Sequence, residues 1–132
     1  MINRENRHPK NRRRTAMYLM WSFYEFISTR RRMTMAIGLL AILTVQEGKS
    51  AEFEQVFLDL TEQVRANEPG TSFYALHRSK DDPHVYKVME QYDSAQALEA
   101  HGQTEYYREA SKALGALLAA PPEIEILDSV KR

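Results

Sequence analysis

Residues Gly70 to Tyr92 read GTSFYALHRSKDDPHVYKVMEQY, and the rest of the chain is organised around them. Two runs rich in aromatic and β-branched residues flank a polar turn at Asp81-Asp82-Pro83, and this pattern predicts a β-hairpin. Glu68-Pro69-Gly70 precedes the hairpin. We expect it to end a helix and reverse the chain, because proline cannot continue a helix and glycine tolerates a positive φ.

Polar-tipped side chains interrupt the apolar faces of this hairpin. Successive strand residues point to opposite faces, so Tyr86, Val88, Glu90 and Tyr92 share one face of the second strand. Tyr74 lies on the first strand. These polar tips on apolar strands make Tyr74, Glu90 and Tyr92 the first candidates for chemistry.

Hydrophobic periodicity predicts the elements on either side of the hairpin. We expect a strand at 36–45, a helix at 50–68, two helical pieces at 94–101 and 105–119, and a last strand at 123–127. The order β-α-β-β-α-β suits a four-stranded antiparallel sheet with helices on one face. This is the ferredoxin-like α+β arrangement.

The other face of such a sheet has no cover of its own. The strand at 36–45 is apolar on both of its alternating faces, which is typical of a strand covered on both sides. A bare face would expose a larger apolar patch than monomers normally tolerate. The pattern therefore predicts a homodimer in which two sheets pack face to face, although it leaves open which set of alternating residues meets the partner.

Composition limits the classes of function. The chain has 132 residues and no cysteine, so we expect one domain, and disulfides and thiolate catalysis are excluded. The net charge of zero hides an asymmetry: residues 1–34 carry +7 and residues 35–132 carry −7. An acidic body argues against nucleic-acid binding, because phosphate contacts need clustered Lys and Arg.

Residues 1–34 read as a basic N-terminal extension to a domain at 35–132. Arginine triplets at 12–14 and 30–32 flank a twelve-residue apolar segment that Glu25 interrupts. The segment is too short to span a bilayer, and no small-residue cleavage site follows it, so we expect a cytoplasmic protein. We expect the extension to be weakly ordered, or upstream sequence read from an early start. The alternative is a short amphipathic helix at an anionic membrane surface.

An ordered set of short motifs resembles a known family. The set consists of Gly48-Lys49, Glu68-Pro69-Gly70, Tyr74, Asp81-Asp82-Pro83, Glu90-x-Tyr92 and Ala97-Leu98-x-x-His101. From Met35 to Val130 the chain is similar to the antibiotic biosynthesis monooxygenase family, which includes quinol monooxygenases. The resemblance implies a dimeric α+β barrel with a pocket between sheet and helices in each subunit. Relatives often carry a second histidine where this chain has Tyr106.

Cofactor motifs are missing from the sequence. No Gly-x-Gly-x-x-Gly and no phosphate loop is present, so we expect no flavin or nucleotide cofactor. His77 and His84 flank the hairpin turn, but two ligands make a poor metal site without a third. We therefore expect no metal and no other cofactor.

Oxygenation without a cofactor requires the substrate to supply electrons to O2. An ionised phenol or hydroquinone can do so once a base has removed its proton. His101 is the expected base, because imidazole titrates near neutrality, and Glu90 is expected to orient it or a substrate hydroxyl. The expected substrate-binding residues, which could stack on a planar ring and donate hydrogen bonds, are Tyr74, Tyr92, Tyr106 and Tyr107.

Three functional hypotheses follow from these residues. The leading one is a cofactor-independent monooxygenase that oxidises a quinol-like or polycyclic aromatic molecule with O2. The second is a small-metabolite isomerase that uses the same histidine for proton transfer. The third is a non-catalytic ligand-binding or stress-response dimer, in which His101 only caps the end of a helix.

Overall fold

The computed structural model describes residues 35–130. The elements are β1 (Ile37–Thr44), α2 (Ser50–Asn67), β2 (Thr71–Arg78), β3 (Val85–Tyr92), α3 (Ala95–Gln103), α4 (Glu105–Leu117) and β4 (Glu123–Asp128). The predicted order β-α-β-β-α-β is confirmed, with two helices, α3 and α4, filling the second helical place. Residues 1–34, where the sequence predicts a basic extension, lie outside the described residues.

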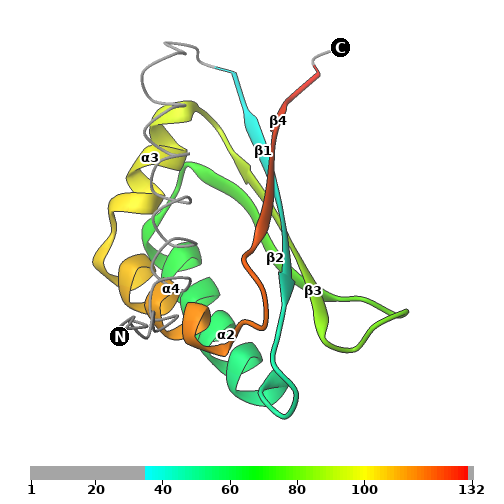
Figure 1. The fold of residues 1–132 in the computed structure, drawn as a ribbon. Coiled ribbons are helices and arrows are strands. Elements are labelled where there is room, and N and C mark those ends of the chain that lie inside the picture. The colour runs from blue at the N-terminus through cyan, green and yellow to red at the C-terminus, as the bar shows by residue number, and fades with distance from the viewer. Residues whose placement is uncertain (1–34, 131–132) are drawn as a thin grey trace, which may run out of the picture.

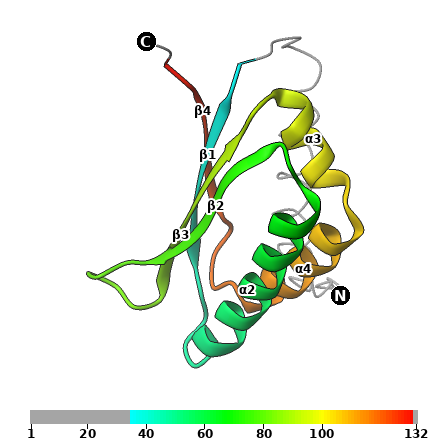
Figure 2. The ribbon, with the colours of Figure 1, turned by 180° about the vertical axis from the view of Figure 1, so that it is seen from behind.

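The four strands form one antiparallel sheet in the order β2-β3-β1-β4. The hairpin β2–β3 therefore lies on one side of the sheet, and β4 forms the opposite edge. Figures 1 and 2 show α2, α3 and α4 stacked on the same face of this sheet, and no helix of residues 35–130 lies on the other face. This is the expected ferredoxin-like α+β fold.

The core lies between the sheet and the helices. Alternate residues of β1 are buried against the helices, from Ile37 through Leu43, and the apolar stripe of α2 packs onto them. The ring of Phe57 stacks on that of Tyr74 with centroids 5.5 Å apart, and Phe53 lies 4.9 Å from Tyr86. The aromatic residues of the hairpin thus join α2 to the sheet.

The Glu68-Pro69-Gly70 turn ends α2 as predicted and starts β2. The backbone N–H of Glu68 still donates to the carbonyl of Val64, which closes the last turn of the helix. A Cβ atom on Gly70 would lie 2.9 Å from the Cβ of Ala97, which is too close for two carbon atoms. Glycine at this position therefore allows α3 to approach the start of β2.

Hydroxyl side chains cap the two helices that follow β3. Ser94 accepts a hydrogen bond from the backbone N–H of Ala97 at the start of α3, and Thr104 accepts one from Tyr107 at the start of α4. Thr104 also donates to the carbonyl of His101 at 2.9 Å. The same residue therefore ends α3 and begins α4.

The uncovered face of the sheet is apolar in its middle and charged at its sides. Gly38, Leu40, Ile42 and Thr44 are the β1 residues that point away from the helices. Around them Phe73, Met89 and Leu127 are 47%, 42% and 42% exposed. Strand alternation places His77 and Lys87 on the β2–β3 side of this face and Glu123 and Glu125 on the β4 side.

This arrangement is complementary to itself. A twofold axis parallel to the strands would bring the acidic side of one copy over the basic side of the other, with the apolar centres in contact. We therefore expect a second copy of this chain to cover the face, through the Leu40 and Ile42 set.

We expect the wild-type protein to be a dimer and Leu40→Asp to be a monomer, because the substitution would bury an unpaired charge at the expected interface and cost several kcal/mol. Leu58→Asp is the matched control, because Leu58 is 54% exposed on α2, away from the sheet. Sedimentation from nanomolar to micromolar concentration measures the association. A wild-type protein that stays monomeric throughout would contradict the prediction.

We also expect a chain that starts at Met35 to keep the melting temperature and the oligomeric state of the full chain. All seven predicted elements form within residues 35–130, and the buried hydrophobic residues described there run from Ile37 to Leu117. Thermal unfolding of both chains is the measurement. A large loss of melting temperature would show that residues 1–34 contribute to the fold.

Candidate active site

His101 is the most enclosed polar side chain of the described region. It lies in the last turn of α3 and is 0% exposed. Its Nδ1 is 2.9 Å from both carboxylate oxygens of Glu68, which follows the last residue of α2. Two residues that are 33 positions apart in the sequence therefore form a buried pair.

Glu68 is ionised in this pair. Burial raises its pKa, but hydrogen bonding and charge from His101, with hydrogen bonds from Tyr106 and Thr71, outweigh burial and hold the pKa below its ordinary value of 4.5. An ionised carboxylate only accepts hydrogen bonds, so Nδ1 of His101 carries a hydrogen and donates it to Glu68. In the neutral ring, Nε2 then carries the lone pair.

The Nε2 atom of His101 is buried and has no hydrogen-bond partner within residues 35–130. A buried polar atom without a partner costs about 1–3 kcal/mol, and such atoms in native proteins often mark functional sites. The bond to Glu68 thus fixes the tautomer of the His101 ring, and Nε2 is left as an acceptor without a partner in the described residues.

Three tyrosine rings surround His101. Their centroids lie 5.3 Å (Tyr74), 5.5 Å (Tyr92) and 4.5 Å (Tyr107) from the imidazole, and they come from β2, β3 and α4. Burial, followed by the charge of Glu90, raises the pKa of Tyr74 well above its ordinary value. The surroundings of the imidazole are therefore aromatic and largely dry.

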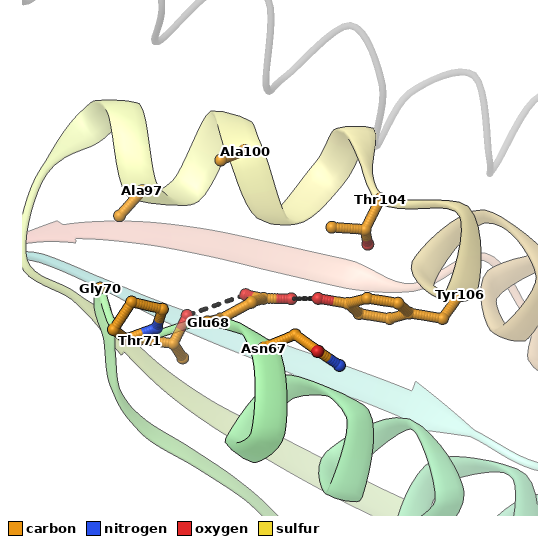
Figure 3. A pocket seen from close by; sticks show the side chains of 9 residues that line it. Asn67, Glu68, Gly70, Thr71, Ala97, Ala100, Thr104 and Tyr106 are labelled. Carbon is orange, nitrogen blue, oxygen red and sulfur yellow. Dashed lines mark hydrogen bonds between the residues drawn. The ribbon is translucent and has the colours of Figure 1, made fainter.

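Glu68 also binds two hydroxyl groups. Tyr106 donates to its Oε1 at 2.5 Å, and Thr71 donates to its Oε2 at 2.9 Å. Figure 3 shows both bonds, with the carboxylate between the two side chains. Burial and the bond to Glu68 raise the pKa of Tyr106 to about 12, so its phenol stays neutral and remains a donor.

Of the two roles that the sequence suggested for Glu90, orienting His101 or orienting a substrate hydroxyl, the first falls to Glu68 in the structure. Its Oε2 accepts a hydrogen bond from Tyr92 at 2.5 Å, and the partner of Nδ1 in His101 is Glu68. Burial raises the pKa of Glu90, although the charge of His101 and the bond from Tyr92 act in the other direction. Glu68 is not among the site residues predicted from the sequence, because Glu-Pro-Gly has the local pattern of a helix stop.

A pocket of about 500 Å³ opens beside the Glu68 carboxylate. It is lined by Asn67, Glu68, Pro69, Gly70, Thr71, Ala97, Ala100, Thr104 and Tyr106. Figure 3 shows small side chains of α3 on one side and Tyr106 at one end. Of the residues predicted for the site, Tyr106 lines this pocket, whereas His101 lies outside the lining and binds the same carboxylate.

Other candidate sites in residues 35–130 are poorer. No three His, Cys, Asp or Glu side chains in this range lie together as a metal ion would need, so His77 and His84 have no third ligand there. No helix within the same range is both long enough and apolar enough to cross a membrane. The Glu68–His101 pair and the adjoining pocket are therefore the strongest candidate site.

Solved structures with this fold come from several bacteria. A candidate antibiotic biosynthesis monooxygenase of Caulobacter crescentus CB15 is 51% identical, with a TM-score of 0.72 over 74% of this chain and 92% of its own. One from Nitrosomonas europaea is 21% identical, with a TM-score of 0.70 over 76% of this chain and 95% of its own. At that lower identity the likeness shows the fold alone.

Sequence comparison gives the same family. A candidate monooxygenase of Pestalotiopsis microspora is 28% identical over 95 residues, which are 70% of this chain and 78% of that protein. Residues 36–113 match the family model described as antibiotic biosynthesis monooxygenase, which is more than half of the chain. With the fold, the family model and the relative from Caulobacter crescentus in agreement, this chain belongs to the antibiotic biosynthesis monooxygenase family.

Proposed function

We propose that this protein is a cofactor-independent monooxygenase that oxidises a quinol-like or polycyclic aromatic molecule with O2. Family membership supports a monooxygenase-like function in general. The observation that carries the finer proposal is the buried His101, whose Nδ1 is bound to ionised Glu68 and whose Nε2 has no hydrogen-bond partner in the described region. Such an imidazole is prepared to accept one proton.

The proton comes from a hydroxyl of the substrate and goes to Nε2 of His101. Glu68 fixes the tautomer and stabilises the imidazolium that forms, as a carboxylate does for the histidine of a catalytic triad. The tyrosine shell excludes water, which strengthens this charge interaction. Productive binding requires the shell to open at Nε2, and Tyr74, Tyr92 and Tyr107 then stack on the substrate ring.

The overall reaction balances without an added reductant. A hydroquinone and one O2 give a hydroxyquinone and one water, so a ring C–H becomes C–OH while the two hydroxyls become carbonyls. The substrate supplies all four electrons. One oxygen atom enters the ring and the other leaves as water. The protein therefore needs only to ionise the substrate and to exclude water from the site.

Oxygen uptake by the purified, metal-free protein against a panel of hydroquinones tests this function. Proton exchange on a carbonyl substrate without uptake would favour the isomerase, and ligand binding with neither reaction would favour a binding dimer. We further propose a cytoplasmic homodimer whose partners are the aromatic substrate and O2. Glu90, hydrogen-bonded to Tyr92, is proposed to assist by orienting a substrate hydroxyl.

On a substrate identified in that panel, we expect His101→Ala to lower turnover by roughly 10²–10⁴-fold, the usual range for a positioned acid–base group. His84→Ala is the matched control, because His84 precedes β3 at the end of the strand opposite to Tyr92. Initial rates of oxygen consumption are the measurement. Wild-type turnover in the His101 variant would show that His101 has only a structural role.

We expect the stability lost in Glu68→Gln to depend on pH. The folded pKa of Glu68 lies below its unfolded value, so the carboxylate stabilises the native state at pH values above the unfolded pKa. That stabilisation disappears as the pH falls through the folded pKa. The difference from wild type should therefore be larger at pH 7 than at pH 3.

Urea unfolding at the two pH values measures this difference. Glu90, whose pKa is shifted in the opposite direction, is present in both proteins. Glu62→Gln is the matched control, because Glu62 is 73% exposed on α2 and its ion pair within residues 35–130 is with Arg65, one turn along the helix. An equal loss for Glu68→Gln at both pH values would show that the Glu68 charge does not stabilise the fold.

A further inference from the structure

Glu90 is a second carboxyl group close to the imidazole of His101. Tyr92, which follows on the same strand, and Tyr74, the cross-strand partner on β2, have ring centroids 5.5 and 5.3 Å from that of the imidazole. Strand alternation puts Glu90 and Tyr92 on the helix-facing side of β3, together with the buried Val88. The Glu90 carboxyl group therefore lies on the same side of the sheet as the imidazole.

A ligand can reach this carboxyl group. Glu90 is partly exposed, whereas Leu39 and Tyr74, which pair with it on the two neighbouring strands, are only 4% and 7% exposed. Beyond Leu39, Ile126 of the edge strand β4 is also partly exposed on this face. The side chains on either side of Glu90 are thus apolar or aromatic, while the carboxyl group itself remains open to a ligand from the helix side.

Few groups are available to stabilise Glu90 as an anion. Within the described part of the chain, one side-chain hydrogen bond reaches it, from Tyr92 to Oε2, and no Lys or Arg forms an ion pair with it. The other titratable side chains that contact the imidazole from β2 and α4, Tyr74 and Tyr107, are phenols and supply no positive charge. An ionised carboxylate in such surroundings is costly, because burial without pairing removes its hydration.

The charges near Glu90 also favour its neutral form before the reaction. Burial raises the pKa of Glu90, and the charge of Glu68 raises it further. The charge of His101 and the hydrogen bond from Tyr92 act in the other direction. The charge of His101 exists only when the imidazole is protonated, and the ring that accepts the substrate's proton is the neutral one. Glu90 therefore has no counter-charge at the moment when the substrate binds.

We propose that Glu90 is a neutral carboxylic acid in the ligand-free protein and donates its hydrogen to the substrate oxygen from which His101 takes a proton. Tyr92 donates to Oε2, so the acid hydrogen is carried by Oε1, where a ligand can accept it. When the substrate's proton moves to Nε2, this hydrogen bond holds the negative charge left on the oxygen. The inference rests on the proposed function, because it adds an anion-stabilising acid to the proposed base.

The proton transfer to His101 strengthens Glu90 as a donor. The imidazolium that forms is a positive charge that acts on Glu90, and a nearby positive charge makes a carboxylic acid more acidic. The hydrogen bond is therefore strongest when the substrate oxygen becomes charged. Interactions that strengthen in the transition state are the ones that accelerate a reaction. A carboxylic acid kept neutral by apolar surroundings can supply such a hydrogen bond.

Infrared difference spectroscopy of the ligand-free protein at pH 7 tests the protonation of Glu90. A protonated carboxyl group has a C=O stretching band that an ionised carboxylate lacks, and this band shifts in D2O. We expect the band in the wild type and in Glu62→Gln, a substitution at an exposed site of α2, and its loss in Glu90→Gln. Wild-type and Glu90→Gln spectra that do not differ in this band would overturn the proposal.

Tyr92→Phe keeps the test valid if Glu90→Gln does not fold. The substitution removes the hydrogen bond to Oε2 and leaves the carboxyl group in place. The acid band should therefore remain and move to higher frequency, as a carbonyl band does when the carbonyl loses a hydrogen bond. An acid band that Tyr92→Phe leaves unchanged would belong to another group and would overturn the proposal.

Turnover tests the donor role, on a substrate identified in the oxygen-uptake panel. Glu90→Leu removes the donor, and we expect it to lower kcat by roughly 10²–10³-fold, the usual loss for one donor to a developing oxyanion. Glu90→Gln keeps an N–H donor of similar shape and should lose no more than about tenfold of the same quantity. Wild-type kcat in Glu90→Leu would overturn the proposal.

The pH dependence of turnover separates this role from a structural one. Glu90 must keep its proton to donate, so wild-type turnover should fall as the pH rises through the pKa of Glu90, and this fall should be absent in Glu90→Gln. The pKa values of Tyr74 and Tyr106 are raised, to about 12 for Tyr106, so these phenols ionise at higher pH. The same fall in Glu90→Gln would overturn the proposal.

The infrared test needs no substrate, so the two proposals can fail separately. An acid band of Glu90 without oxygen uptake would refute the oxygenase and leave the neutral Glu90 standing. Oxygen uptake by a protein that lacks the band would overturn the inference about Glu90 and leave the oxygenase standing.

Discussion

The hydrogen bonds of the Glu68 carboxylate join the helices to one another and to the sheet. The carboxylate stands just beyond the end of α2 and accepts hydrogen bonds from the start of β2, from α3 and from α4, through Thr71, His101 and Tyr106. Four elements are thereby tied to one charge that is 10% exposed. Hydrogen bonds to a charged group are roughly twice as strong as neutral ones. These bonds therefore hold the four elements in one arrangement more specifically than helix packing alone would.

Burying the Glu68–His101 pair costs free energy, which the packing of the surrounding fold offsets. Charge is removed from water, and Nε2 of His101 is left buried without a partner in the described residues. The aromatic contacts between α2 and the hairpin, and the close approach that Gly70 permits, hold the pair in place. The fold thus places a carboxylate and three tyrosine rings around the imidazole of His101, although no single helix or strand needs these side chains for its own stability.

The two carboxylates that the charge of His101 reaches differ in protonation behaviour. Contacts hold the pKa of Glu68 down, whereas burial raises that of Glu90. Acid–base sites commonly contain two neighbouring acids whose surroundings shift their pKa values in opposite directions. Glu68 thus keeps its charge beside His101, while Glu90 accepts a hydrogen bond from the Tyr92 hydroxyl on the sheet.

The order and type of the elements, the ferredoxin-like class and the tyrosine-bearing face of the hairpin could be predicted from the chain, because they follow from local periodicity and turn residues. Two features required the folded structure. The odd-numbered residues of β1 face the helices, which could not be predicted because both alternating sets are apolar. Glu68, and not Glu90, is the hydrogen-bond partner of His101. That pairing joins a helix terminus to a residue 33 positions later, and no local pattern encodes such a contact. It arises when α2 and α3 pack on the same face of the sheet.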